Sequence, residues 1–383
     1  MSWCVHHTSQ HGNLQLNQRM KRIFNLLAAL LPLLLVACGG NEKSALWGDI
    51  APFFRVPAEW QGDFGDYRSP LLFENGDTVR TAEQWALRRE EIKTLWHSKM
   101  GQWPEIIYNQ PLTKLDTVQL EEGIIRHRVR FNWTPNEQTE GYLLVPTAPK
   151  GPKPAAIVVF YEPETALGME EGLKYGPHRD FAIQLARRGF VALSIGTTET
   201  SISRTYSIRY PSKGNETVEP LSMLGYAAAN AYEALALEED VNGDKIGIVG
   251  HSYGGKWAMF ASCFYEKFAC SAWGDPGIVF SEEKGGYVNY WEPWYLGSLG
   301  TYDYMKAEGH DLHEVHALMA PRPFLVSGGY SDEPKQWRVL NHSVEVNKLL
   351  GYKERVGMTN RELHAPNPEA NEVIYKFFEY HLK

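Results

Sequence analysis

A serine set between glycines is the feature of this chain that most directly points to chemistry. The string Gly250-His251-Ser252-Tyr253-Gly254 follows an apolar run over residues 245–250, typical of a buried strand, and opens a helical pattern over residues 253–265. Glycines at both ends allow the sharp turn that lifts a serine hydroxyl out of a sheet. This arrangement of strand, turn and helix predicts that Ser252 is a nucleophile.

A serine hydroxyl attacks efficiently only when a base removes its proton and an acid orients that base. His364 follows a strand expected over residues 353–358 and precedes the last expected helix, which is the position that such a base needs. We therefore expect His364 to be the base.

We expect Asp332 to be the acid, because it follows a strand expected over residues 323–327 in the string Gly-Gly-Tyr-Ser-Asp. A carboxylate at this point would emerge at the same edge of the sheet as Ser252. Two alternatives stay open. Glu333 is adjacent, and Asp275 ends the preceding strand, although the Pro-Gly that follows Asp275 also suits a turn.

The tetrahedral intermediate that follows attack needs backbone N–H groups aimed at its oxyanion. We expect Tyr253, directly after the nucleophile, to supply one of them. The other is expected from Tyr161 or Glu162, in the loop after the strand over residues 155–160. Such chemistry requires no cofactor, and no Cys/His spacing resembles a zinc site, so no metal is expected.

Strands and helices alternate around these residues. Strands are expected over residues 124–133, 141–145, 155–160, 190–195, 245–250, 268–273, 323–327 and 353–358, and helices over residues 179–188, 220–238, 253–265, 335–350 and from 368 onward. An antiparallel start followed by this alternation predicts an α/β-hydrolase fold, with a mixed, mainly parallel, doubly wound sheet and helices on both faces.

We expect the α/β-hydrolase catalytic domain to span residues 118–383. Residues 38–117 are expected to form a tether and a small N-terminal helical cap, because an amphipathic pattern that starts at Thr81 runs to Met100. Residues 1–37 are expected to be a signal peptide with an upstream extension, since a basic start at Met20 leads into an apolar run over residues 26–37.

The string Leu-Val-Ala before Cys38 resembles the lipobox of bacterial lipoproteins. That resemblance implies a lipid, such as palmitate, on Cys38 and a place in the cell envelope, at the outer membrane. The net charge of −8, with no cluster of Lys and Arg, excludes nucleic acid as a partner. In an oxidising compartment Cys263 and Cys270 are expected either to pair or to remain buried thiols.

The segment from about residue 118 to the C-terminus resembles α/β-hydrolases that include the glucuronoyl esterases of carbohydrate esterase family 15 and acetyl xylan esterase-like bacterial lipoproteins. The resemblance rests on Gly250-x-Ser252-x-x-Gly255-Lys256 and on the stretch Asp311-Leu312-His313 with Ala317-Leu318-Met319-Ala320-Pro321-Arg322-Pro323. It implies an esterase acting on a polysaccharide or oligosaccharide. Glucuronoyl esterases usually carry Arg after the serine, whereas this chain has Tyr253, which weakens any inference of uronate recognition.

An aromatic insertion is expected over residues 275–310, after a strand at the same edge of the sheet as Ser252. Rings at such an edge suit the apolar face of a sugar. We expect its Tyr290, Trp291 and Trp294 to bind substrate, together with Lys256, which is placed to meet a sugar hydroxyl or carboxylate.

These features favour a serine hydrolase that cleaves acetyl or uronate esters of carbohydrates during polysaccharide breakdown. Two other functions stay open. One is a serine peptidase of the prolyl-oligopeptidase type without a propeller, because the residues before 118 are too few for a propeller. The other is a lipoprotein that binds glycans without catalysis.

Overall fold

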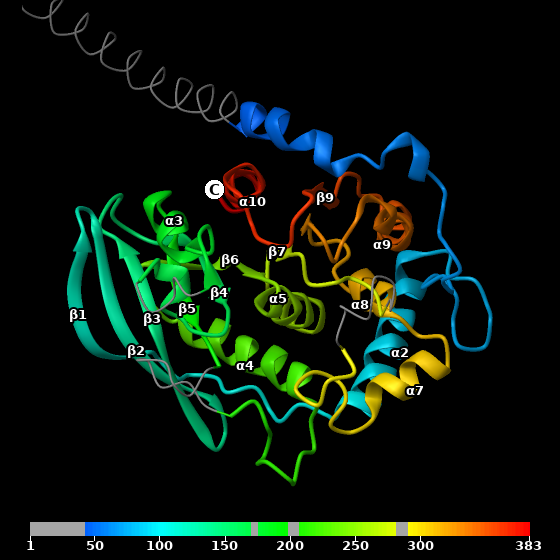
Figure 1. Ribbon diagram of the computed structural model, residues 1–383, viewed down its shortest axis with the longest axis horizontal. Helices are drawn as coiled ribbons and strands as arrows, with labels where there is room; N and C mark the ends of the chain where they lie inside the picture. Colours follow the sequence, from blue (N-terminus) through cyan, green and yellow to red (C-terminus); the bar gives the residue numbers. More distant parts are fainter. Residues whose placement is uncertain (1–42, 170–174, 198–206, 281–289) are drawn as a thin grey trace, which may run out of the picture. The chain divides into compact units, whose positions relative to one another are not determined.

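The computed structural model describes residues 43–169, 175–197, 207–280 and 290–383 (Figure 1). By its internal contacts the chain divides into two units, residues 1–49 and residues 50–383. The expected signal peptide and Cys38 lie outside the described residues. Within the described ranges, no helix combines the length and apolar character that crossing a membrane requires.

One sheet forms the centre of the unit over residues 50–383. Its strands are β1 (Thr113–Glu121), β2 (Ile124–Thr134), β3 (Glu137–Pro146), β4 (Lys153–Val159), β5 (Val191–Ile195), β6 (Val241–His251), β7 (Cys270–Gly274), β8 (Phe324–Gly328) and β9 (Val356–Asn360). Their order across the sheet is β1-β2-β3-β5-β4-β6-β7-β8-β9. The pairs among β1, β2, β3 and β5 are antiparallel, and the pairs from β5 to β9 are parallel. The expected mixed, mainly parallel sheet is confirmed.

Helices cover both faces of the sheet, as predicted. They are α2 (Ala82–Met100), α3 (Phe181–Arg187), α4 (Pro220–Leu235), α5 (Tyr253–Phe264), α7 (Thr301–Ala307), α8 (Leu312–Ala317), α9 (Trp337–Leu349) and α10 (Pro368–Leu382). On one face, Arg188 after α3 pairs with Glu372 on α10 at 2.7 Å (Figure 1). On the opposite face, Trp257 of α5 donates to the carbonyl oxygen of Leu224 on α4 at 2.6 Å.

Side-chain caps define where two of the long helices begin. At α2, Thr81 Oγ1 accepts from Gln84 N at 3.2 Å, which confirms the predicted start. At α10, Asn367 Oδ1 accepts from Ala370 N at 2.8 Å and a proline occupies the first turn. Because α10 begins only at residue 368, the loop that carries His364 lies between β9 and this cap.

The edge strand β1 was not among the expected strands. Its sequence TKLDTVQLE is polar on both sides, and every residue in it is exposed or half-buried, so it gives little alternation to detect. The sheet consequently begins at Thr113, before the domain boundary expected at residue 118. Residues 50–117 belong to the same compact unit as the sheet.

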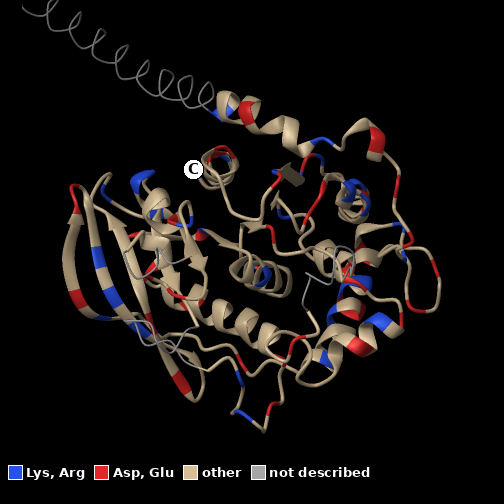
Figure 2. Ribbon diagram, viewed as in Figure 1, with Lys and Arg blue, Asp and Glu red and all other residues tan. Residues whose placement is uncertain are grey.

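The N-terminal helix α2 packs into the hydrophobic core rather than lying apart from it. The ring of Trp96 lies 6.3 Å from that of Phe260 on α5 and 6.1 Å from that of Phe280. Trp96 Nε1 also donates to Glu314 Oε2 on α8 at 3.3 Å. Figure 2 shows α4 and α5 almost without charged residues, whereas basic residues recur along β2. Nearly all residues of these two helices are buried, so they form part of the interior, and α5 directly follows Ser252.

Cys263 on α5 and Cys270 on β7 are both free thiols, and both are buried. Of the two alternatives expected for this pair, a disulfide or two buried thiols, the structure shows the buried thiols. Burial raises the pKa of both thiols, which disfavours the reactive thiolate form.

Candidate active site

Ser252 lies in the sharp turn between β6 and α5. Its backbone has φ 58° and ψ −115°, a conformation that is costly for a residue with a side chain. Ser252 N donates to Gly274 O at 2.6 Å, and Lys256 N donates to Ser252 O at 3.0 Å. Hydrogen bonds on both sides therefore maintain the strained turn that presents the hydroxyl.

The two glycines around Ser252 are required by close backbone approach. A Cβ at Gly250 would lie 2.2 Å from Gly254 O, and a Cβ at Gly254 would lie 2.0 Å from Val159 O at the end of β4. Neither distance leaves room for a side chain. The glycine spacing seen in the sequence thus follows from the packing of α5 directly against β4.

Ser252, His364 and Asp275 form a chain of hydrogen bonds. His364 Nε2 lies 2.8 Å from Ser252 Oγ, and His364 Nδ1 lies 2.6 Å from Asp275 Oδ2. The side chain of Asp275 is fully buried, and that of His364 is 28% exposed. The imidazole is thus placed to take the serine proton while a buried carboxylate orients it. The residues expected as nucleophile and base are brought together.

The expected contact of Asp332 with His364 is not present, and this prediction of the acid is wrong. Strand β7 pairs directly with β6, whereas β8 lies one strand farther from the nucleophile. Asp275, directly after β7, therefore emerges beside Ser252 and reaches the histidine. The other alternative, Glu333, pairs with Lys335 at 3.6 Å.

Asp275 and Asp332 hold each other's loops. Asp275 Oδ1 accepts from the backbone N–H groups of Gly329 at 2.8 Å and Asp332 at 3.0 Å. In return, Asp332 accepts from the N–H groups of Gly277 at 2.9 Å and Ile278 at 2.6 Å. Burial, followed by the neighbouring Asp275 carboxylate, raises the pKa of Asp332 to about 7. Asp332 thus acts on the turn that carries the triad acid and not on the histidine.

Arg361 fixes the loop of His364 and was not predicted. Its guanidinium donates to the carbonyl oxygens of His364, Ala365 and Ser327, each at 2.8 Å. These bonds join the loop after β9 to the end of β8. The sequence gives little signal for such a role, because a lone arginine in a loop is most often a solvated surface residue.

His251, directly before the nucleophile, lies against the base. The centroid of its ring is 4.8 Å from that of His364. Burial, and then the charge of His364, lowers the pKa of His251 well below its ordinary value of 6.5. A neutral His251 adds no positive charge that would oppose protonation of His364.

The residues expected to supply the oxyanion amides converge beside Ser252. Tyr253 is the first residue of α5, where backbone N–H groups have no acceptor within the helix. Tyr161 follows β4, and its ring stacks on that of Tyr253 with centroids 4.5 Å apart and planes at 9°. Glu162, the alternative second donor, is the next residue and is buried.

Two residues expected to bind substrate are buried instead. Lys256 is 6% exposed, donates from Nζ to Pro276 O, and lies 4.7 Å from the ring centre of Tyr290. Tyr290 is fully buried and donates to Gly277 O at 2.7 Å. Burial lowers the pKa of Lys256 to about 8. Both predictions are corrected, because Lys256 in the first turn of α5 faces the segment after β7, and the Tyr290 ring packs against it there.

Trp291 and Trp294 lie at the surface, with 36% and 44% of each residue exposed. The ring of Trp294 is 5.7 Å from that of Tyr295, which in turn lies 5.8 Å from that of Tyr253. A row of rings thus leads from the nucleophile turn to an exposed indole. Residues 281–289 of the expected insertion lie outside the described residues.

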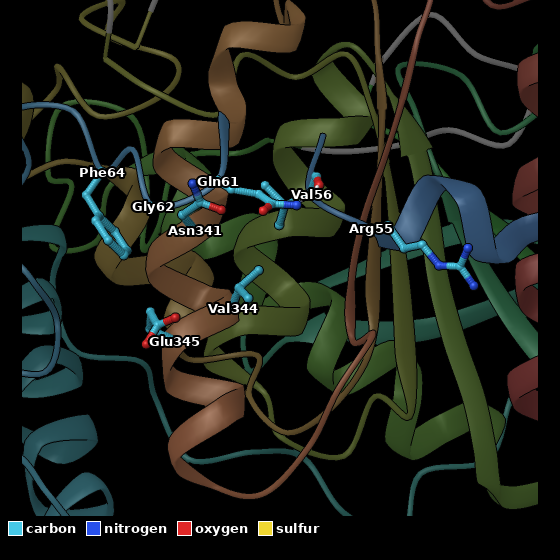
Figure 3. A pocket seen from close by; sticks show the side chains of 8 residues that line it. All are labelled: Arg55, Val56, Gln61, Gly62, Phe64, Asn341, Val344 and Glu345. Carbon is cyan, nitrogen blue, oxygen red and sulfur yellow. Dashed lines mark hydrogen bonds between the residues drawn. The ribbon is translucent and has the colours of Figure 1, made fainter. Parts of the chain in front are cut away.

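A cavity of about 460 Å³ lies elsewhere, between the segment over residues 55–64 and α9 (Figure 3). It is lined by Arg55, Val56, Gln61, Gly62, Phe64, Asn341, Val344 and Glu345. Figure 3 shows the guanidinium of Arg55 directed away from the other labelled side chains. None of the residues expected to do chemistry lines this cavity, so it is not part of the candidate active site.

The strand order, the strained serine after β6 and the hydrogen-bonded histidine and aspartate define a serine-type α/β hydrolase. No protein-family model matches the chain. A carbohydrate esterase from an unknown prokaryotic organism is 22% identical, over 82% of this chain and 84% of the relative. The expected resemblance to carbohydrate esterases is confirmed.

Solved structures of esterases share the fold, and two of them are similar over most of this chain. A glucuronoyl esterase from Solibacter usitatus superposes with a TM-score of 0.70 at 17% identity, over 86% of this chain and 99% of that chain. A carbohydrate esterase family 15 glucuronoyl esterase from Caldicellulosiruptor kristjansonii gives a TM-score of 0.63 at 21% identity, over 86% of this chain and 93% of that chain. At these identities the likeness establishes the α/β-hydrolase fold.

Proposed function

We propose that this protein is a serine carboxylic ester hydrolase that acts on esters of carbohydrates. The observation that carries the proposal is the chain of hydrogen bonds from Ser252 Oγ through His364 to Asp275 at 2.8 and 2.6 Å. A buried carboxylate, an imidazole and a strained serine in this order form the arrangement that serine hydrolases use. The similarity to carbohydrate esterases supports the substrate class.

The reaction follows from this geometry. Ser252 Oγ attacks the ester carbonyl carbon while His364 Nε2 takes its proton, and Asp275 stabilises the imidazolium. The oxyanion that forms accepts from the N–H of Tyr253 and from that of Tyr161 or Glu162. The alcohol then leaves with the proton from His364. Water, deprotonated by the same histidine, attacks the acyl-enzyme, and the acid is released with Ser252 restored.

The exposed rings near the site support a sugar as part of the substrate. Trp291 and Trp294 are large apolar surfaces on the insertion, and an indole face suits the apolar face of a sugar. Acetyl and uronate esters are the proposed bonds. Tyr253 stands directly after the nucleophile, where glucuronoyl esterases usually carry Arg, and this difference favours acetyl over uronate esters.

A panel of glycan esters tests this proposal. The purified protein would be assayed on acetylated, feruloylated and methyl-uronate glycans and on p-nitrophenyl acetate, with Ser252→Ala as the control. We expect release of acid from at least one glycan ester and no turnover by Ser252→Ala. Turnover that survives Ser252→Ala, or cleavage of aminoacyl-naphthylamides in place of esters, would contradict the proposal.

We propose further that Cys38 carries a lipid that anchors the protein in the cell envelope, at the outer membrane. The support is the sequence before Cys38, which has a basic start, an apolar run and a Leu-Val-Ala-Cys string. In a bacterial host that processes lipoproteins, the protein should fractionate with membranes and incorporate labelled palmitate, whereas Cys38→Ser should do neither. Equal labelling of both forms would rule the anchor out.

A further inference from the structure

An oxyanion hole requires N–H groups from two distant parts of the chain to point at one atom. Here those parts are Tyr253 at the start of α5 and the loop of Tyr161 and Glu162 after β4. We infer that the face-to-face stack of the Tyr161 and Tyr253 rings positions these two amides. The inference rests on the proposed function and makes both tyrosines positioning residues for ester hydrolysis.

The stack is tight and includes a third ring. The Tyr161 and Tyr253 centroids lie 4.5 Å apart with planes at 9°, and the Tyr175 ring also stacks on Tyr161, at 5.4 Å and 18°. Tyr161 therefore packs against two rings. Tyr253 is only 3% exposed, so its ring has little freedom to rotate away.

The backbone at the same point is locked by close contacts. Gly254 lies against β4 so closely that a Cβ there would approach Val159 O to 2.0 Å. Tyr161 O accepts from Thr197 N at 2.7 Å. Thr197, after β5, thus fixes the β4 loop at the level of the stack.

The two stacked rings belong to Tyr253, which supplies one amide of the hole, and to Tyr161, which either supplies the other amide or directly precedes Glu162, the alternative donor. A ring attached to a neighbouring residue would fill space without setting either amide, whereas a shift of the Tyr161 or Tyr253 ring moves its own Cα and amide. Removal of one ring should therefore loosen the oxyanion site while the hydrogen bonds of Ser252, His364 and Asp275 remain. A displacement near 1 Å at such a site can cost about 100-fold in rate.

The test compares Tyr161→Leu and Tyr253→Leu with Tyr161→Phe and Tyr253→Phe. We expect the Leu variants to lower kcat on p-nitrophenyl acetate by about 10- to 100-fold with KM nearly unchanged, because the oxyanion forms only after binding. The Phe variants keep the ring and should stay within about 3-fold of the wild type. The double Leu variant should lose little more than either single variant, since both break one stack.

A matched control separates positioning from simple loss of packing. Phe54 and Phe377 form another stacked pair, 5.7 Å apart at 13°, between the N-terminal segment and α10. Phe377 is fully buried, so Phe377→Leu should lower the melting temperature at least as much as Tyr161→Leu and yet leave kcat unchanged. Half-buried Tyr161 offers the safer test if Tyr253→Leu does not fold.

The rate at which a fluorophosphonate labels Ser252 distinguishes failure of the proposed hydrolase function from failure of the positioning role of the stack. That reaction also builds negative charge in the oxyanion hole, and it needs no carbohydrate. If the wild type is not labelled, the proposed function fails. If the wild type is labelled and the folded Leu variants are labelled at the same rate, the positioning role fails. It fails equally if the Phe variants lose as much kcat as the Leu variants, or if the losses appear only in KM.

Discussion

Two buried carboxylates lie behind His364, and their hydrogen bonds differ in kind. Asp275 Oδ2 meets the imidazole at 2.6 Å, whereas both oxygens of Asp332 accept from backbone N–H groups. Only Asp275 can stabilise the imidazolium directly. Asp332 acts on the reaction through the main chain that carries Asp275.

This difference predicts that replacing each aspartate by asparagine lowers kcat by a different factor. Asp275→Asn should lower kcat by about 10³- to 10⁴-fold, because the amide favours the wrong imidazole tautomer. Asp332→Asn retains one acceptor for the turn and should lower kcat by only about 10-fold. Steady-state kinetics on p-nitrophenyl acetate measures both. A loss at Asp332 as large as that at Asp275 would return the role of acid to Asp332.

The sequence identifies residues that depend on local pattern and misses those that depend on strand order. Ser252 and His364 follow from the strand and helix on either side of them. The choice between Asp275 and Asp332 depends on which strand lies next to β6, and neither residue type nor spacing states that. Lys256 was predicted from the nucleophile turn and Tyr290 from the aromatic insertion, and neither pattern shows that a paired polar group is buried.

At the scale of elements, the contact of α5 with β4 controls the geometry of the nucleophile. Gly254→Ala would force a Cβ to within 2.0 Å of Val159 O, so the helix must move. We expect a loss of at least about 3 kcal/mol in the free energy of unfolding and a loss of esterase activity. Urea unfolding and kcat would be measured together. Gly243→Ala is the control, because its Cβ would meet nothing closer than 3.6 Å.

The helices α8 and α9 hold the N-terminal segment through histidines. His313 Nε2 donates to Arg68 O at 2.7 Å, His342 Nε2 donates to Phe64 O at 3.1 Å, and the two rings lie 5.0 Å apart. Burial, followed by the charge of His313, lowers the pKa of His342 to about 4. Burial also lowers the pKa of His313 and that of the adjacent His316.

These pKa values predict acid sensitivity. The pKa of His342 is about 4 in the folded protein against 6.5 as its ordinary value, so the unfolded chain binds the proton more tightly. The stabilisation is present above pH 6.5 and is lost as the pH falls toward 4. Between pH 7 and pH 5, His342 alone should remove about 2 kcal/mol from the free energy of unfolding. Urea unfolding of His342→Gln should show a smaller fall, and a parallel fall in both proteins would contradict the prediction.

For the molecule as a whole, the sequence predicts the fold better than the site. The strands from β2 to β9 and the helices that alternate with them have strong apolar patterns, so periodicity finds them to within a few residues. The polar edge strand β1 and the contacts of α2 with α5 have no such local signal, because they depend on how distant segments pack. The same limit applies to Arg361, whose partners are carbonyl groups of other loops.

At the same scale, the exposed rings of the insertion predict a preference for polymeric substrate. Trp294→Ala should lower kcat/KM on an acetylated glycan by about 5- to 10-fold, because one sugar contact is lost, and leave p-nitrophenyl acetate hydrolysis unchanged. The control is Tyr352→Ala, which removes a ring of similar exposure, 41% against 44%, outside the insertion. Equal losses on both substrates would contradict a role in glycan binding.

Arg361 holds the loop of His364 through backbone carbonyl groups. The loop side chain of Leu363 therefore contributes little to the position of His364. Leu363 is 68% exposed, and Cys263 and Cys270 are fully buried. A cysteine introduced in place of Leu363 would therefore be, among the described residues, the one thiol accessible to a maleimide dye. A fluorophore at that position sits beside the base and would report substrate arrival in real time without entering the hydrogen-bonded triad.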